Sequence, residues 1–163
     1  MAPTSRHHPV MDGLPLHPAL VHFPIAMGLV IPIVGAALLV ATRRDDALVG
    51  KALWLPAGLQ FLCVILAFFA QRTGDEEHHA VEDFVDRALI HAHEEAGEVA
   101  FISAGVTLLV WFVAAVAKKP GLGRKAGWAA VAVGLVAMGL ALRAGKLGGE
   151  LVYLHGAAQA FTQ

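Results

Sequence analysis

Residues 16–41, LHPALVHFPIAMGLVIPIVGAALLVA, indicate a membrane-spanning helix, because they are apolar almost throughout and long enough to cross a lipid bilayer. A membrane-spanning helix needs about 20 apolar residues, within a range of about 17–25. Three further apolar stretches follow. The four stretches predict an all-α, four-helix transmembrane bundle that forms a single integral-membrane domain over residues 1–163, with spans at 19–41, 52–70, 99–117 and 126–142.

The composition favours the same class of protein. The chain is 57% hydrophobic and 15% charged, whereas soluble domains carry about 25% charged residues. The net charge of −1 does not indicate nucleic acid as a partner. A single cysteine, Cys63, excludes an intrachain disulfide and the zinc-finger and CxxC patterns. The N-terminal residues 1–13 hold no apolar region before a cleavage site, so we expect no cleavable signal peptide.

The basic residues predict the orientation of the spans. Short loops that are rich in Lys and Arg face the cytoplasm. The connections between spans one and two and between spans three and four are the most basic short segments, with Arg43, Arg44, Lys51, Lys118, Lys119, Arg124 and Lys125. Both termini and residues 72–95 are then expected on the outer side. This places the protein in a bacterial inner membrane, with both termini in the periplasm.

The segment before span three is expected to be helical and to lie outside the membrane. Apolar residues recur from Val81 to Val99 at the spacing of an amphipathic helix. This pattern predicts a third helix that starts near residue 80 and continues into the span, with the polar residues 73–83 at its start. After span four, the glycines between residues 145 and 149 are expected to break the helix and to bring His155 back to the outer level.

All nine histidines map to the outer side of this topology: His7, His8, His17, His22, His78, His79, His91, His93 and His155. Imidazoles and carboxylates that gather at one membrane face are the donors that a metal ion or haem needs. An interface is also simply where polar residues are tolerated. We therefore interpret His7, His8, His78 and His79 as solvated tail or loop residues.

His93 is expected to point into the bundle. At about 100° per residue, it shares the apolar face of Leu89 and Ala96, whereas His91 is on the polar side. Gly97 follows one turn later and leaves room beside the ring. The alternative for His93 is a core histidine that is bonded to a carbonyl or to Glu150.

His22 lies about one turn inside span one, where an ionisable residue is a functional-site hypothesis by default. His17 precedes Pro18, which disfavours helical geometry for His17 and places it at the helix entrance. His17 is thus a second ligand, a donor to another ligand, or only a cap. We predict that His22 and His93 approach each other, with His17 and His155 in or next to the same site.

The motifs LHPALVHFPIA, HEEAGEVA and GKLGGELVYLHG resemble DUF2231, a family of uncharacterised four-span bacterial membrane proteins, over residues 14–158. The residues that match its motifs are His17, Pro18, His22, Pro24, His93, Gly97, Gly149, Tyr153, His155 and Gly156. Some relatives are fused to cytochrome-like redox modules or are encoded near them. The resemblance therefore implies a haem or redox role. The run Glu94, Glu95 and Glu98 is less typical of the family.

The sequence is compatible with three functional classes. The first is a b-type haem protein with His22 and His93 as axial ligands beside Gly97, exchanging electrons with a periplasmic redox partner or a quinone. The second is a non-haem zinc, copper or iron site, drawn from His17, His22, His93, His155, Glu94, Glu98 and Glu150. The third is a non-catalytic scaffold subunit with structural histidines. No nucleophile–base pair is apparent, so we do not expect a stand-alone enzyme. The lipid bilayer is the expected partner, and homo-oligomerisation stays open.

Overall fold

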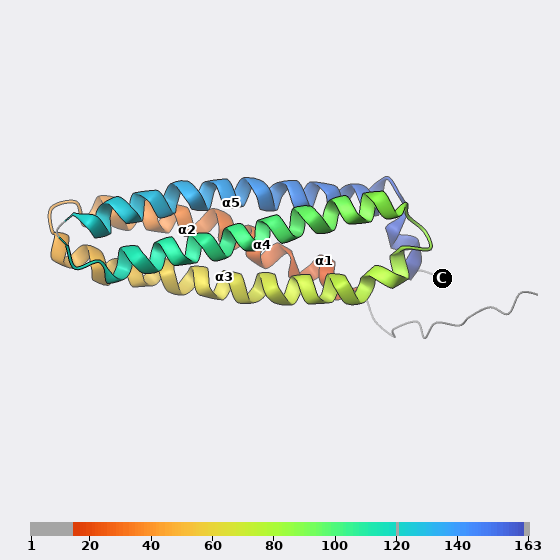
Figure 1. Cartoon of the computed structure of the whole chain (residues 1–163), viewed down its shortest axis with the longest axis horizontal. Coiled ribbons are helices and arrows are strands. Elements are labelled where there is room, and N and C mark those ends of the chain that lie inside the picture. The colour runs from red at the N-terminus through yellow and green to blue at the C-terminus, as the bar shows by residue number, and fades with distance from the viewer. Residues whose placement is uncertain (1–14, 120, 162–163) are drawn as a thin grey trace, which may run out of the picture.

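The structure is a computed structural model that describes residues 15–119 and 121–161, and it is built almost entirely from helices (Figure 1). The described residues contain no strand. The elements are α1 (Leu16–Leu20), α2 (His22–Ala41), α3 (Asp46–Val81), α4 (Arg87–Val116), α5 (Leu122–Tyr153) and the 3-10 helix η1 (Ala157–Phe161). The predicted all-α four-helix bundle is confirmed, with α1 and α2 together forming its first helix.

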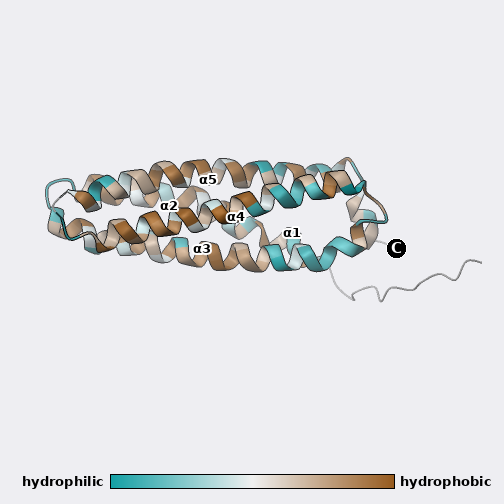
Figure 2. Cartoon of the chain, in the orientation of Figure 1, coloured by the Kyte–Doolittle hydropathy of each residue, from teal (hydrophilic) through white to brown (hydrophobic). Residues whose placement is uncertain are grey.

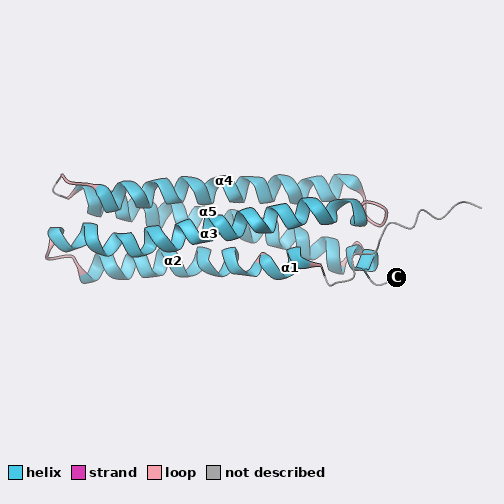
Figure 3. Cartoon of the chain, turned by 90° about the horizontal axis from the view of Figure 1, so that it is seen from below, coloured by secondary structure: helices cyan, strands magenta, loops and turns pink. Residues whose placement is uncertain are grey.

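The four long helices run side by side (Figures 1 and 3), and α2 and α4 each contact both α3 and α5. The backbones of α2 and α4 do not approach each other closely in the described residues, so these two helices lie on one diagonal of the bundle and meet only through side chains. The α2–α3 and α4–α5 connections share one end, which we call the basic end. The α3–α4 turn, residues 82–86, and η1 share the other, which we call the histidine end.

The outer surface of the bundle is apolar, as a lipid environment requires. Each of the four helices is long and apolar enough to cross a membrane. Large apolar side chains point outward along their length, such as Phe61, Leu109 and Val136. Helix α3 has 36 residues, about 54 Å at 1.5 Å per residue, and therefore exceeds the roughly 30 Å hydrocarbon core of a bilayer. Its polar last turns lie at the histidine end (Figure 2).

The core is packed most tightly toward the basic end. Trp111, Leu53, Ile31 and Leu39 are almost completely buried there. Gly35 of α2 faces the Trp111 ring so closely that an added Cβ would overlap it.

Arg124, near the start of α5, holds the end of α2. Its guanidinium donates to the carbonyls of Leu39 (3.0 Å) and Thr42 (2.8 Å) and pairs with Asp46 (2.8 Å). Carbonyls at a helix C-terminus have no partner within their own helix. This one side chain therefore satisfies the end of α2 and ties it to α3 and α5.

The first span is interrupted at Val21, between α1 and α2. Proline has no backbone N–H, so Pro24 cannot donate to the carbonyl of Leu20, four residues earlier. Pro32 and Pro56 lie inside α2 and α3 and are buried. The interruption separates the short helix that carries His17 from the longer helix that carries His22.

Two boundaries differ from the sequence prediction. Residues 73–81 continue α3 rather than starting the next helix, and α4 begins at Arg87 rather than near 80. The carboxylate of Asp86 caps α4 by accepting from the N–H of Ala88 at 2.8 Å. The polar composition of 73–81 marks where the chain leaves the apolar layer, but nothing in it stops a helix.

Helix α5 also continues where a break was expected. It runs without interruption through Gly145, Gly148 and Gly149 to Tyr153. The chain turns only at Gly156, which has a φ of +79°. Glycine lowers helix propensity by about 1 kcal/mol relative to alanine, a cost that packing can offset. Here Gly148 packs against the His93 ring.

Candidate functional site: two imidazoles between two glycines

His17 is fixed at the start of α1 by two contacts from α3. Glu77 Oε1 accepts the backbone N–H groups of Leu16 (2.7 Å) and His17 (3.1 Å), so it caps the helix from outside. The His17 ring then reaches α3, where Nδ1 donates to the carbonyl of Ala70 at 2.7 Å. Gly74 is one turn further on, and a Cβ there would lie 3.0 Å from His17 Nδ1 and Cε1.

His93 is held on α4 in the same manner. Its Nδ1 donates to the carbonyl of Ala144 on α5 at 3.0 Å. Gly148 is one turn further on, and a Cβ there would lie 2.9 Å from His93 Cε1. The predicted orientation is confirmed, because His93 is half-buried and His91 is exposed. The carbonyl bond also matches the alternative of a carbonyl-bonded core histidine.

The two arrangements are repeats of one unit. In each hairpin, a histidine near the start of the first helix donates to an alanine carbonyl of the second helix, and the glycine four residues later lies against the ring. The second helices share sequence as well. Both contain Lys-Ala-x-Trp near their starts, at 51–54 and 125–128, and the alanine, the glycine and a glutamate follow at equal spacing. The sequence prediction missed this internal repeat, which identifies Gly74 and Gly148.

The two rings meet inside the bundle. Their centroids are 5.9 Å apart and their planes are 80° to each other. A carbonyl only accepts hydrogen bonds, so each bonded Nδ1 carries the proton and each neutral ring keeps its lone pair on Nε2. In the part of the chain that the structure describes, neither Nε2 makes a hydrogen bond. The Nε2 atom of each ring is thereby left as the nitrogen that could accept a hydrogen bond or bind a metal ion.

His22 does not take the place predicted for it. The ring is exposed, and Nδ1 donates to the carbonyl of Pro18 within its own helical run at 2.6 Å. The prediction that His22 approaches His93 was wrong, and His17 occupies that position. Five residues on a helix correspond to about 140° around the axis, so His17 and His22 cannot both face the bundle interior.

The other predicted site residues are dispersed. His155 is exposed in the turn after α5, Glu98 is exposed on α4, and Glu150 pairs with Lys146 at 3.6 Å. Within the described residues, these three side chains make no hydrogen bond, ion pair or ring contact with His17 or His93. Gly97 leaves open space, because a Cβ there would meet no atom within 4 Å. The glycine that touches the His93 ring is instead Gly148.

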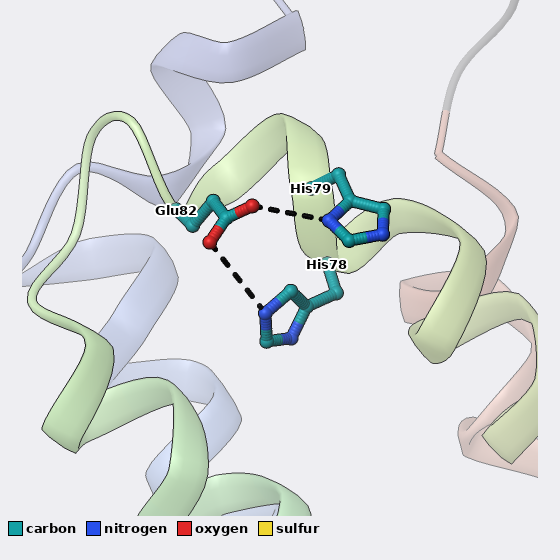
Figure 4. A group of neighbouring side chains, drawn as sticks. All are labelled: His78, His79 and Glu82. Carbon is teal, nitrogen blue, oxygen red and sulfur yellow. Dashed lines mark hydrogen bonds and ion pairs between the residues drawn. The ribbon is translucent and has the colours of Figure 1, made fainter.

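A second histidine group lies at the histidine end, where isolated solvated residues were expected. His78 and His79 are in the last turn of α3. Both contact Glu82, the residue after the helix (Figure 4), and His78 also contacts Glu94 of α4. His91 also contacts Glu94, at 3.1 Å. The hydrogen bond from His79 lowers the pKa of Glu82, and the nearby Arg87 lowers it further. His7 and His8 lie outside the described residues.

A four-helix bundle with an apolar exterior and a pair of inward imidazoles defines a membrane protein with a candidate cofactor site. The family described as predicted membrane protein (DUF2231) matches residues 13–160, and the chain belongs to this family. No curated protein and no solved structure matches the chain.

Proposed function

We propose that this membrane protein binds a b-type haem through His17 and His93 and transfers electrons at the histidine end of the bundle. The observation that carries the proposal is the pair of neighbouring imidazoles. Their ring centroids are 5.9 Å apart, and the Nδ1 of each ring is held by a main-chain carbonyl. Histidine ligands of metals almost always donate their second ring nitrogen to such a partner.

The spacing suits a shared metal centre. A histidine nitrogen lies about 2.0–2.1 Å from a bound ion, which places the centroids of two rings on one ion about 5–6.5 Å apart, depending on the angle at the metal. The observed 5.9 Å lies within this range. Four-helix bundles commonly hold cofactors between facing helices.

The number of ligands favours haem over a bare ion at this pair. Zinc sites use three or four protein ligands, but among the described residues two imidazoles come together here, and Glu77 is engaged as the cap of α1. A haem leaves only two axial positions to the protein. When bound, it supplies one-electron chemistry. His17 and His93 would orient it, and the carbonyls of Ala70 and Ala144 would keep both rings in the ligating tautomer.

The same proposal includes an orientation. The basic end would face the cytoplasm by the positive-inside rule, and the histidine end would face the periplasm. Electrons would then be exchanged with a periplasmic redox partner or with a quinone in the outer leaflet. Reporter fusions in the connections at residues 42–45 and 117–121 test this, and a periplasmic location of either connection contradicts it.

The decisive experiment is an absorption spectrum of the detergent-purified protein, oxidised and reduced, after expression with a haem supply. The wild type should show a Soret band and sharp bands on reduction. His17→Ala and His93→Ala should each lose most of the bound haem while keeping the helix content. His22→Ala and His155→Ala are matched controls, because both rings are exposed, and they should retain it.

Two results would reject the proposal. The first is a wild-type protein that takes up no haem during expression or by reconstitution. The second is a His17→Ala protein that retains the full Soret band. Loss of haem in His22→Ala but not in His17→Ala would restore the ligand pair expected from the sequence.

A further inference from the structure

The histidine end holds a cluster of five side chains that the haem proposal does not use. Helix α3 and the residue after it contribute His78, His79 and Glu82, and α4 contributes His91 and Glu94. Both segments present the pattern His-x-x-Glu, at 79–82 and at 91–94. Residues three apart on a helix are neighbours, so each segment pairs one imidazole with one carboxylate of its own.

His78 lies at the centre of this cluster, between the two carboxylates. Its Nδ1 contacts Glu94 Oε1, and its Nε2 is 4.0 Å from Glu82 Oε2. On either side, His79 Nδ1 is 3.0 Å from Glu82 Oε1, and His91 Nδ1 is 3.1 Å from Glu94 Oε2. One ligand atom each from His78, His79 and Glu82 lie within 4.8 Å of one another (Figure 4).

The backbone under the cluster is anchored. The turn between α3 and α4 packs its Val85 side chain onto Ile90, Leu151 and Ala157, all of which are buried. This small core ties the end of α3 and the start of α4 to α5 and η1. The cluster therefore stands on fixed elements, whereas exposed side chains such as His79 and His91 are free to adjust. Ligands carried on helices are positioned more precisely than ligands on loops, and here rotation of the exposed rings has to close the site around an ion.

The donor set indicates the ligand. Imidazole nitrogens together with carboxylate oxygens suit zinc, copper, iron and nickel, whereas calcium and magnesium prefer oxygen alone. Of the two carboxylates, Glu82 is paired with Arg87, whose Nη2 is 3.1 Å from Glu82 Oε2, whereas Glu94 contacts only His78 and His91 among the described residues. With neutral histidines, this group of charges is negative. The Arg87 side chain is 75% exposed, so it can turn away from Glu82 when another cation binds there.

We propose that this cluster binds one divalent first-row transition metal ion, with His78, His79 and Glu82 as ligands and Glu94 or water completing the shell. In a tetrahedral site, ligand atoms about 2.0–2.2 Å from the ion lie about 3.4 Å apart. Side-chain rotation has to close the remaining distance. The site differs from the haem site in residues, in exposure and in ligand, and it does not depend on haem binding.

Zinc is the probe for the test, because it has no redox chemistry. Chelator-treated full-length protein in detergent is titrated with Zn²⁺ by calorimetry at neutral pH. The expected result is one ion per chain. His78→Ala and Glu82→Gln should each weaken binding at least tenfold. His155→Ala is the control: it removes an exposed histidine at the same end of the bundle, and binding should be unchanged.

The variants also separate the two sites. His17→Ala should lose haem and keep zinc, and His78→Ala should do the reverse. Circular dichroism checks that each variant is folded. Should His78→Ala fail to fold, Glu82→Gln decides, since it keeps the shape of the side chain. Absence of binding at millimolar Zn²⁺, or an unchanged affinity in Glu82→Gln, overturns the proposal.

Discussion

Adding one methyl group at Gly148 tests whether the His93 ring is held as the structure shows. A Cβ at this position would lie 2.9 Å from Cε1 and 3.3 Å from Nδ1 of His93, so the ring has to move. Its hydrogen bond to the carbonyl of Ala144 then lengthens or breaks. Overpacking a fitted site typically costs about 1–3 kcal/mol. Alanine in place of glycine in a helix returns about 1 kcal/mol, so Gly148→Ala should destabilise the protein by about 0–2 kcal/mol.

Gly97→Ala is the matched control. Gly97 is also helical and lies one turn from His93, but an added Cβ would meet no atom within 4 Å. This variant should gain the full helix benefit of about 1 kcal/mol. The two variants should therefore differ by about 1–3 kcal/mol in the free energy of unfolding. For a chain of this size, each kcal/mol moves the thermal midpoint by about 2–4 °C.

Thermal unfolding in detergent, followed by circular dichroism, measures the difference between the two variants. If haem binds, Gly148→Ala should also weaken it by about 10–100-fold, as loss of an outer-shell hydrogen bond does, whereas Gly97→Ala should not. Equal thermal midpoints, or a lower midpoint in Gly97→Ala than in Gly148→Ala, would contradict the packing of Gly148 against His93. Such a result would support Gly97 as the glycine beside the ring, as the sequence suggested.

Three further predictions concern the rest of the bundle. Gly35→Ala forces the buried Trp111 ring out of its position. Thermal unfolding should show that it lowers the free energy of unfolding by about 1–3 kcal/mol. Arg124→Ala removes the side-chain donor from the Leu39 carbonyl and one of the two donors from the Thr42 carbonyl, and should cost about 1–3 kcal/mol in the same measurement. The pKa of Glu82 is lowered in the fold, chiefly by His79. The ionised Glu82 carboxylate should therefore stabilise the fold above its unfolded-state pKa, and this stabilisation should be lost as the pH falls through its folded-state pKa. In Glu82→Gln, this loss of stability in acid should be absent. A variant with the same dependence of stability on pH as the wild type would contradict the role given to Glu82.

The sequence predicted the fold and the inward orientation of His93 for physical reasons. Span length and composition reflect the bilayer itself, so four helices could be counted without a structure. The position of His93 followed from helical periodicity, because α4 has an apolar and a polar side at that level. His91 and His93 differ by about 200° around the axis, and only one of them could share the face of Leu89.

The other half of the site could not be predicted in this way. The first span is apolar on all sides, so periodicity did not indicate whether His17 or His22 faces inward. That choice depends on Glu77, which caps α1 from another helix and so fixes where His17 meets α3. Similarly, Gly148 looked like a helix breaker, because its compensating contact with His93 is a tertiary one.

The division of the paired imidazoles between two hairpins gives a ligand at that site a mechanical effect. One ring belongs to the α1–α3 hairpin and the other to the α4–α5 hairpin. A ligand held by both would therefore act as a reversible cross-link between residues that are far apart in the chain. At a hundred times its dissociation constant, it would add about 2.7 kcal/mol to stability. The basic end is already fastened by Arg124 and the Trp111 core, and the histidine end by the small core around Val85. Occupancy would therefore add a further tie between the two hairpins at the level of the paired rings.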